Sequence, residues 1–408
     1  MDFTLPYTDE QQRFRQEVRT WLEANIPANM RDPFDSNDFT EGMYKWWREK
    51  HKEIAKKGWL YPTYPKEYGG GGLTGDHETI IEEEFTRARV VRGMASGLLL
   101  TTLLVWATEE QKRRFLPPFL TAEKVTWQKL TEPQSGTDLA NYQSRAVRDG
   151  DDWLLTGNNV FISGRGDHPD YLFGPMLTDT EAPRHRNLGY FIIPVPAPGL
   201  DIRQQNLVGG HDQHFIFMDN VRVPGDHLIG GDHQGWQVLG THLEQEHGGR
   251  GQAFPRDEVV DNMLTFLREG ERRGEARGSD PVIQQVAMEG YIDGHVNALL
   301  QKRTYWMYQA HMEIVWEGII GNVFGREKSG RNADRVREVM GPAAQLGAKD
   351  PLAPFGGQPD VYQRTTFGTL HAGGSLNIAK VTAARRIGIS RTKERPAPTP
   401  STAGRGGA

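Results

Sequence analysis

The stretch TEPQSGTD, at residues 131–138, gathers residue types that suit the binding of a flat polar group. Gly136 permits close approach of the backbone, and the small hydroxyl residues around it can donate and accept hydrogen bonds. Such a loop can bring N–H and O–H groups against a flat heterocycle or a phosphate. The same residues also suit an ordinary proline-containing turn capped by Thr131 or Ser135. The stretch by itself leaves both interpretations open.

Other kinds of catalytic centre are poorly supported. The 408 residues include no cysteine, which excludes disulfides, thiolate catalysis, iron–sulfur clusters and cysteine-based zinc sites. His242 and His247 are five residues apart rather than four, and no H-E-x-x-H motif is present, so no metal site is predicted. Redox chemistry in this chain would need an organic cofactor.

Composition favours a globular protein. Lysine and arginine total 48 against 53 acidic residues, and the net charge of -5 gives no reason to expect a nucleic-acid partner. Hydrophobic residues make up 37% of the chain, which is enough for a large core. The start of the chain lacks a secretory profile, and the longest apolar run, residues 94–107, is too short to span a bilayer. We expect a cytoplasmic protein without a membrane partner, and a buried helix at this run.

Three regions of different periodicity must position the loop. Residues 1–121 have apolar residues at helical spacing, interrupted by a proline- and glycine-dense loop at residues 58–72. Residues 122–232 consist of short β-rich runs separated by turn formers. Helical periodicity returns over residues 233–391, and residues 392–408 form a tail that we predict to be disordered.

The order of these regions argues against a Rossmann dinucleotide fold, because it contains no repeating βαβ units. The glycine-rich GGRG at residues 248–251 follows no convincing strand and lies in helical sequence, so it does not support a GxGxxG site. A flavin held elsewhere in the fold is the better interpretation.

Five pieces of the sequence carry a more specific signal, because they occur together and in the order typical of one family. They are GWLYPTYPKEYGGGG (58–72), ATEEQKRRFLPPFL (107–120), TEPQSGTD (131–138), DWLLTGNNVFISG (152–164) and VRVPGDHLIGGDHQGW (221–236). Over nearly its whole length the chain resembles the acyl-CoA dehydrogenases. The resemblance implies a mainly α fold with a central β-barrel: an N-terminal helical domain, a middle β domain and a C-terminal four-helix bundle.

The resemblance also implies FAD as the cofactor, and residues that bind it. Leu130 and Thr131 would meet the flavin ring, with the Thr131 hydroxyl near its reactive nitrogen. Thr137 would contact the pyrophosphate. Phe161 stands where relatives usually carry tryptophan and would pack on the flavin, and Ser163 would contribute a hydroxyl.

Two further segments extend the implied cofactor site. LHAGGSLNIAKVTAARRIG (370–388) looks like the family's glycine-rich segment followed by a helix, so Ser375 and Asn377 would contact the cofactor where a helix start offers free N–H groups. Arg272 aligns with an arginine that usually reaches the pyrophosphate across a dimer interface. The chain departs from the family here, because it lacks the usual aromatic-glycine pair after Arg272 and the Gln-x-x-Gly-Gly motif in residues 339–360.

Dehydrogenation of a thioester needs a carboxylate base, because the α-proton is only weakly acidic while the flavin takes the β-hydrogen as hydride. Many relatives carry this glutamate where the present chain has Gly373. Others carry it after the Gly-Trp pair that closes the β region, and counting from Trp236 leads to Glu246. Glu244 is the alternative, but on a helix the two side chains project about 200° apart, so only one can face the flavin.

Two neighbours of the base position affect the interpretation. His247 stands where such relatives usually carry arginine and could bind the substrate, and Gly373 would border the substrate. An imidazole there would make activity sensitive to pH. Glu244 and Glu246 would equally suit an ordinary first helical turn, where the helix dipole stabilises carboxylates.

We therefore predict an FAD-dependent acyl-CoA dehydrogenase of fatty acid metabolism that forms a trans-2-enoyl-CoA. The resemblance implies an acyl-CoA substrate, an electron-transfer flavoprotein as electron acceptor, and a homodimer, homotetramer or heteromer. Loss of the glutamate at Gly373 is also compatible with a flavin monooxygenase, oxidase or desulfinase of the same fold. The missing Gln-x-x-Gly-Gly motif favours a non-catalytic subunit of a heteromeric enzyme. The acyl group depends on a pocket whose size spacing alone does not give.

Overall fold

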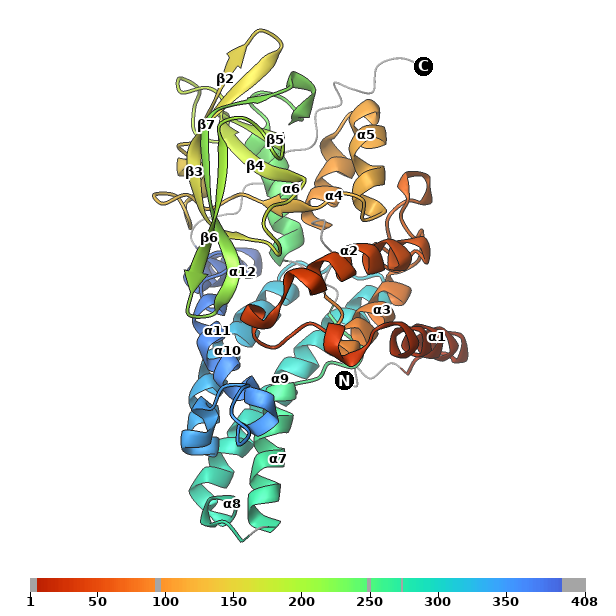
Figure 1. Cartoon of the computed structure of the whole chain (residues 1–408), viewed down its shortest axis with the longest axis vertical. Coiled ribbons are helices and arrows are strands. Elements are labelled where there is room, and N and C mark those ends of the chain that lie inside the picture. The colour runs from red at the N-terminus through yellow and green to blue at the C-terminus, as the bar shows by residue number, and fades with distance from the viewer. Residues whose placement is uncertain (1–5, 92–96, 248–250, 273, 391–408) are drawn as a thin grey trace.

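The computed structural model of the chain describes residues 6–91, 97–247, 251–272 and 274–390, without the side chains of residues 211–212 and 244–247. Figure 1 shows a helical region, a twisted sheet and a second helical region in chain order. The tail predicted to be disordered, residues 392–408, lies outside the described residues.

The N-terminal region is helical, as predicted. Its helices are α1 (Asp9–Asn25), α2 (Glu41–Lys56), α3 (Gly75–Ala88), α4 (Gly97–Trp106) and α5 (Glu109–Leu120). Capping boxes start two of them, formed by Thr8 with Gln11 and by Thr108 with Gln111. Leu99, Leu100 and Leu103 of α4 have no exposed surface, so the described part of the apolar run is the buried helix that we expected.

The middle region is a single mixed sheet. Its strands are β1 (Thr126–Gln128), β2 (Arg145–Asp149), β3 (Asp152–Ser163), β4 (Tyr171–Leu177), β5 (Leu188–Pro194), β6 (Leu200–Leu207), β7 (Gly210–Val223) and β8 (Leu228–Ile229). Their order is β6-β7-β3-β2-β4-β5-β8, with β1 added parallel to β4. The long strands β3 and β7 pair antiparallel, with register shifts on either side of the segment that contains Asn158 and Asn159.

The β-barrel implied by the resemblance is wrong for the described strands, because β6 and β8 remain separate edges. β8 has only two residues, and the Gln111 side chain of α5 donates a hydrogen bond of 2.8 Å to the Leu228 carbonyl oxygen. That bond satisfies a carbonyl oxygen at the edge of the sheet, which would pair with another strand if the sheet closed into a barrel. The other edge exposes Asp201 and Arg203, and charged side chains disfavour the addition of a further strand.

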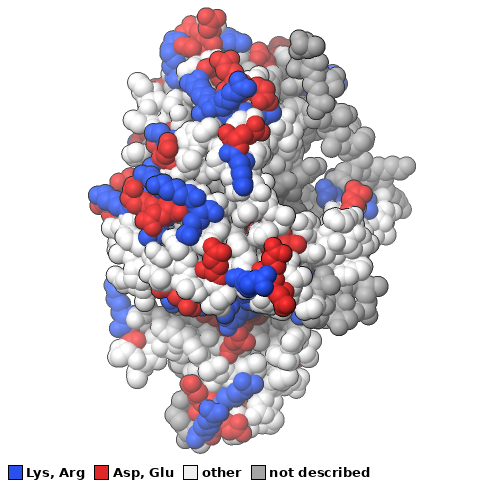
Figure 2. All heavy atoms as spheres, turned by 90° about the vertical axis from the view of Figure 1, so that its right-hand side faces the viewer, with Lys and Arg blue, Asp and Glu red and all other residues white. Residues whose placement is uncertain are grey.

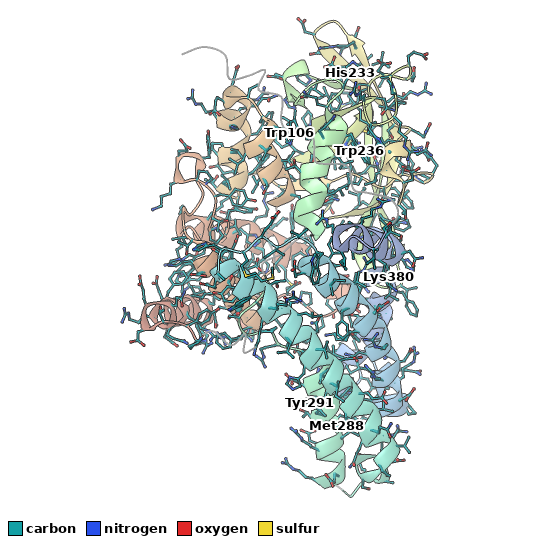
Figure 3. All side chains as sticks on the ribbon, turned by 180° about the vertical axis from the view of Figure 1, so that it is seen from behind. Trp106, His233, Trp236, Met288, Tyr291 and Lys380 are labelled. Carbon is teal, nitrogen blue, oxygen red and sulfur yellow. The ribbon has the colours of Figure 1, made fainter. Side chains whose placement is uncertain are left out.

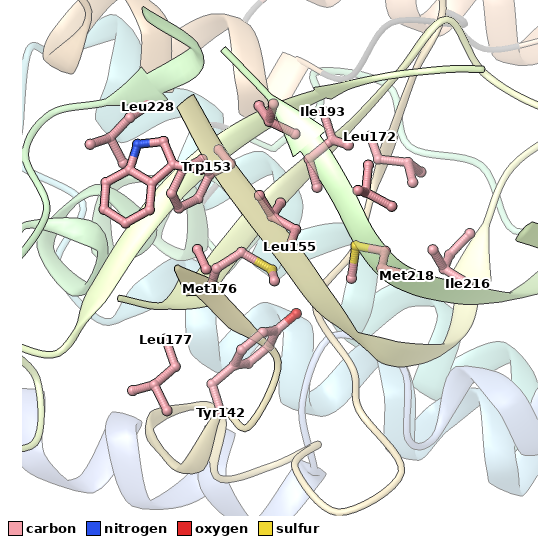
Figure 4. Packing of buried hydrophobic residues seen from close by; sticks show 14 of the residues in the cluster. Tyr142, Trp153, Leu155, Leu172, Met176, Leu177, Ile193, Ile216, Met218 and Leu228 are labelled. Carbon is pink, nitrogen blue, oxygen red and sulfur yellow. The ribbon is translucent and has the colours of Figure 1, made fainter. Parts of the chain in front are cut away.

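The sheet curves around an apolar core, seen from close by in Figure 4. Leu155, Leu172, Ile193 and Ile216 come from four strands and have no exposed surface. Alternate residues of a strand point to the same face, so each strand contributes a row of such side chains. Tyr142 enters this core from the segment between β1 and β2. The core therefore holds one end of the segment that contains the TEPQSGTD loop.

The C-terminal region is helical. Its helices are α6 (Gly235–His247), α7 (Glu258–Arg272), α8 (Ala276–Ser279), α9 (Pro281–Gln309), α10 (Glu317–Met340), α11 (Gln358–Thr369) and α12 (Leu376–Ile387). α6 packs on β5, where Val238 and Leu239 are buried together with Tyr190. α7, α9 and α10 share a separate core that includes Met263 and Val339, and α11 and α12 pack against α10.

Within the described ranges, no helix has both the length and the apolar character needed to cross a bilayer. Figure 2 shows positive and negative side chains interspersed over the face that it presents. That face therefore has no extended field of one sign.

Candidate active site

The TEPQSGTD loop is shaped by a buried carboxylate. Glu132 is 2% exposed, and its two carboxylate oxygens accept hydrogen bonds of 2.7 Å each from the backbone N–H groups of Gln143 and Ser144. The backbones of Glu132 and Ser135 exchange two hydrogen bonds, of 2.9 and 3.1 Å, around Pro133. Hydrogen bonds to an ionised acceptor are among the stronger ones in proteins, so Glu132 ties the turn to the following segment. Apart from its place in the motif, nothing in the sequence distinguishes this residue.

Thr131 is fixed by its main-chain carbonyl. The Thr131 oxygen accepts hydrogen bonds from the Val160 N–H at 2.9 Å and from Asn159 Nδ2 at 3.1 Å. Leu130 is buried, whereas Thr131 is half-buried. Because Val160 immediately precedes Phe161, these bonds bring two of the predicted cofactor residues, Thr131 and Phe161, to the same place.

Phe161 has an unusual backbone and an unusual environment. Its φ of 56° lies in the left-handed region, which a bulky side chain rarely adopts, and 53% of its surface is exposed. It lies within the register shift of β3 against β7 between Asn159 and Ile162, as expected for a bulge that redirects a side chain. Its N–H donates to Gln205 Oε1 at 3.0 Å. An exposed ring on the residue after Val160, whose N–H bonds the Thr131 carbonyl, suits the ring end of a flavin.

Two predicted cofactor contacts, the pyrophosphate contact Thr137 and the hydroxyl of Ser163, are solvent-accessible. Thr137 is exposed, and its neighbour Asp138 forms an ion pair with Arg184. Ser163 is also exposed, and its Oγ accepts a hydrogen bond of 2.8 Å from Gln213 Nε2. Each hydroxyl keeps a proton that it can donate. The donor set therefore suits anionic oxygens, although neither hydroxyl is buried.

The glycine-rich segment is organised by a buried arginine. Arg326 of α10 is 8% exposed and donates hydrogen bonds to the carbonyl oxygens of Thr369, Leu370 and Gly374 at 3.1, 2.6 and 2.9 Å. This holds Gly373 in the left-handed region, with φ of 66°. A glutamate at Gly373 would be strained there, because only glycine adopts such a conformation without cost.

The same segment leads into α12 with its first N–H groups partly free. Ser375 is the N-cap of α12, and its Oγ accepts a hydrogen bond of 3.3 Å from the Ile378 N–H. Asn377 is exposed in the first turn. The remaining N–H groups of this turn are the kind of donor that binds an anion. Both predicted residues therefore lie at a helix start, as expected.

The two candidate bases lie in the last turns of α6. Because α6 begins at Gly235, Glu244 and Glu246 are its tenth and twelfth residues. The interpretation of them as first-turn residues is therefore wrong, and the helix dipole does not favour a carboxylate at this end. The structure does not describe the side chains of Glu244, Glu246 and His247, so the assignment of the base stays a prediction.

The preceding turns of α6 are anchored in the protein interior. His242 has no exposed surface, and its Nδ1 lies 2.8 Å from Tyr190 Oη of β5. Trp106 Nε1 of α4 donates to Thr241 Oγ1 at 2.9 Å, and Figure 3 shows Trp106 beside this helix. His242 is thus part of a core contact. No group of histidine, aspartate and glutamate side chains suitable for a metal occurs among the described residues.

Arg272 is remote from the other predicted cofactor residues. It is exposed in the last turn of α7, next to α8, at the end of the molecule opposite the sheet (Figure 1). It therefore lies far from Thr131 of its own chain, and a flavin held at Thr131 could meet Arg272 only from a second chain.

Helix α9 carries an uncovered apolar stripe. Its exposed apolar residues are Val282, Met288, Tyr291, Ile292, Val296 and Leu299. Figure 3 labels Met288 and Tyr291 on this helix. A contiguous apolar surface of this kind marks an interaction site.

Comparison with known proteins identifies the family. The models for the acyl-CoA dehydrogenase N-terminal domain and middle domain match residues 8–123 and 128–221. The acyl-CoA dehydrogenase IpdE1 of Mycolicibacterium smegmatis is 30% identical over 408 aligned residues, which cover 94% of this chain and 98% of that protein. The chain belongs to the acyl-CoA dehydrogenase family. Membership implies a flavin cofactor, typically FAD, and flavin-dependent oxidoreductase activity in general.

Solved acyl-CoA dehydrogenase structures share the fold. A structure described as "Tcur3481-Tcur3483 steroid ACAD" is 26% identical, with a TM-score of 0.81, and covers 97% of this chain and 100% of that one. The ChsE4-ChsE5 complex from Mycobacterium tuberculosis is 23% identical, with a TM-score of 0.79 and coverage of 95% and 100%. At 23% identity, the similarity to the ChsE4-ChsE5 complex shows the fold alone. In the described part of this chain, helical regions lie on either side of an open sheet in chain order.

Proposed function

We propose that this protein is an FAD-dependent acyl-CoA dehydrogenase, which converts an acyl-CoA thioester to a trans-2-enoyl-CoA. The observation that carries the proposal is the pairing of Thr131 with Phe161. The Val160 N–H bond to the Thr131 carbonyl ties the backbone of the half-buried Thr131 to the residue that precedes the exposed Phe161. This arrangement supports binding of a planar redox cofactor, which is what the family uses.

The chemistry divides between the cofactor and the chain. When bound, the flavin supplies a hydride acceptor for the β-carbon. Glu246 removes the α-proton as general base. The Thr131 hydroxyl would donate a hydrogen bond to the cofactor ring, Leu130 would contribute apolar surface, and Phe161 would pack on the ring. Together these residues would orient the ring.

The assembled enzyme completes the site. Arg272 is proposed to reach the pyrophosphate of the cofactor bound by a neighbouring subunit, because it lies far from Thr131 of its own chain. The apolar stripe on α9 supports a contact between subunits. A homodimer or homotetramer satisfies both features, with an electron-transfer flavoprotein as the electron acceptor.

The substrate class is best tested broadly. The likeness to a structure described as a steroid ACAD makes steroid-derived thioesters one class to include. Straight-chain and branched acyl-CoA thioesters form the other classes. The purified holoenzyme is mixed with each thioester without oxygen, and loss of the flavin absorbance is recorded. Bleaching by at least one thioester is expected; no bleaching by any of them would remove the dehydrogenase proposal.

A second candidate is a subunit of a heteromeric enzyme. Gly373 is held in a left-handed conformation unsuited to glutamate, and the two solved structures reported above are each named for two different chains. Co-expression with neighbouring homologues, followed by affinity purification, tests this candidate. A second homologous chain in equal amount would support it, whereas a flavin-loaded oligomer of this chain alone would oppose it. Oxygen consumption with a non-thioester substrate would instead indicate an oxidase or monooxygenase.

A further inference from the structure

A lysine with no exposed surface lies just before the cofactor loop. Lys129 follows β1, and its backbone N–H donates to the Phe173 carbonyl oxygen of β4 at 2.8 Å. Its Nζ lies 3.1 Å from Tyr142 Oη, 2.9 Å from the Pro175 carbonyl oxygen and 3.0 Å from Met176 Sδ. Lysine is almost never fully buried unless it is paired, and none of these three atoms carries a formal charge. The proposed mechanism does not use this amine.

The amine is connected to Thr131 through two further side chains. Asn159 Nδ2 donates to Tyr142 Oη at 2.8 Å and to the Thr131 carbonyl oxygen at 3.1 Å. Asn159 has no exposed surface, and its Oδ1 has no hydrogen-bond partner among the described residues. If the Asn159 amide were flipped, Oδ1 instead of Nδ2 would face the Thr131 carbonyl oxygen, and two acceptors would meet. The Thr131 carbonyl therefore determines the orientation of the Asn159 amide. A continuous buried path therefore joins Lys129 to the residue that faces the cofactor.

The hydrogen-bond donors and acceptors along this path match only if Lys129 is neutral. An ammonium would donate to all three neighbours of Nζ, and Tyr142 Oη would then accept from both Lys129 and Asn159. The phenol proton would be left without an acceptor in the interior. A neutral amine donates to Pro175 and Met176 and accepts from the phenol, so each of these groups is satisfied.

The electrostatic surroundings agree with this count. Burial lowers the pKa of Lys129 to about 7, and the carboxylate of Glu132 acts in the opposite direction. Burial raises the pKa of Tyr142 well above its ordinary value, so the phenol keeps its proton. Tyr142 and Glu132 are the ionisable groups that act on this amine in the described part of the chain.

We propose that Lys129 is a positioning residue for the cofactor loop: a neutral buried amine that holds Tyr142 and Asn159, and through them the main-chain carbonyl of Thr131. The identity of the ligand at Thr131 rests on the proposed function. The charge state of Lys129 and its link to Thr131 do not.

The charge state is tested on the full chain without cofactor. The free energy of unfolding is measured for the wild type, Lys129→Met and the exposed control Lys45→Met from about pH 7.5 to about pH 9.5. The unfolded lysine, with its ordinary pKa, binds more protons than the folded one in this window, so stability rises with pH. The unfolding equilibrium of wild type relative to Lys129→Met should shift by roughly a hundredfold across the window. A ratio that does not change with pH would overturn the neutral amine.

The positioning role is tested by cofactor affinity. Apo wild type, Lys129→Met, Tyr142→Phe and the double variant are titrated with FAD, and the visible spectrum of the bound flavin is recorded. Each single variant should weaken binding by about tenfold and shift the flavin absorption, as expected for loss of one hydrogen bond. The double variant should be no weaker than either single variant, because both interrupt one path.

A conservative variant of Lys129 should restore FAD affinity. Lys129→Gln keeps an uncharged donor and acceptor, so it should bind FAD within about threefold of wild type, as should Lys45→Met. Wild-type affinity and spectrum in both Lys129→Met and Tyr142→Phe would overturn the positioning role. Absence of FAD binding by the wild type would instead remove the proposed function, and the pH experiment would still decide the charge state of Lys129.

Discussion

Trp106 Nε1 donates a hydrogen bond of 2.9 Å to Thr241 Oγ1, which joins α4 to α6. Thr241 lies five residues before Glu246 on the same helix, and the adjacent His242 is bonded to Tyr190 of the sheet. Hydrogen bonds thus hold this part of α6 against both the N-terminal helices and the sheet. A base at Glu246 would depend on these contacts for its position.

Removing the Trp106–Thr241 bond should slow proton abstraction more than it weakens substrate binding. In Thr241→Val the end of α6 loses one neutral hydrogen bond, so we expect flavin reduction to be about threefold to tenfold slower, with little change in KM. Stopped-flow reduction by a saturating acyl-CoA provides the measurement. Thr241→Ser keeps the hydroxyl and should behave as wild type. Equal rates for the valine and serine variants would show that this bond does not position the base.

Substitution of Glu246 should separate chemistry from binding. Glutamine cannot accept a proton, so in Glu246→Gln the rate of flavin reduction should fall by at least about a hundredfold, while acyl-CoA still binds. Glu244→Gln is the matched control, since the two positions project to nearly opposite sides of the helix. The control should keep most of its activity. The reverse pattern would assign the base to Glu244, and unchanged activity in both variants would place the base elsewhere.

The sequence was most informative where a function depends on local residue types. The Thr131 loop and the aromatic at Phe161 lie within short motifs, and the structure brings these two residues together. The closed barrel was predicted wrongly, because closure depends on how distant strands pair. Gln111 of α5 covers the Leu228 edge from more than a hundred residues away. No local pattern reveals such a contact.

Lys129 was missed for a related reason. In a strand, Trp127 and Lys129 would share a face, and this alternation could have drawn attention to a lysine on the buried side. Its partners come from separate segments, Tyr142 before β2 and Pro175 in β4, and the chain must be folded before they meet. The first-turn interpretation of Glu246 is wrong because α6 already begins at Gly235, so Glu246 lies in its last turn.

A buried carboxylate in the N-terminal helices should control stability in acid. Glu84 has no exposed surface, and three arginines donate hydrogen bonds to it: Arg15, Arg19 and Arg87. Burial alone would raise the pKa of Glu84, but these hydrogen bonds hold it at about 2. Because the folded pKa lies below the ordinary value, the stabilisation is present above about pH 4.5 and is lost as the pH falls toward 2.

The test is the pH dependence of unfolding in Glu84→Gln. At neutral pH the variant leaves three arginines without their shared partner, so we expect a loss on the order of 3 kcal/mol. The difference from wild type should shrink as the pH falls below about 4.5. The exposed Glu82→Gln, on the same helix, should cost less than about 0.5 kcal/mol. A difference between Glu84→Gln and wild type that stays constant down to about pH 2.5 would contradict the low pKa.

Phe161 should affect cofactor binding and folding in opposite directions. Its exposed ring contributes little to the core, whereas its left-handed backbone is strained. Phe161→Gly and Phe161→Ala both remove the ring, so each should weaken FAD binding by about tenfold or more. Only glycine relieves the backbone, so the glycine variant should be about 1 kcal/mol more stable than the alanine variant. Phe161→Trp keeps an aromatic face and should retain affinity. Unchanged affinity in the glycine and alanine variants would show that the ring does not cover the cofactor.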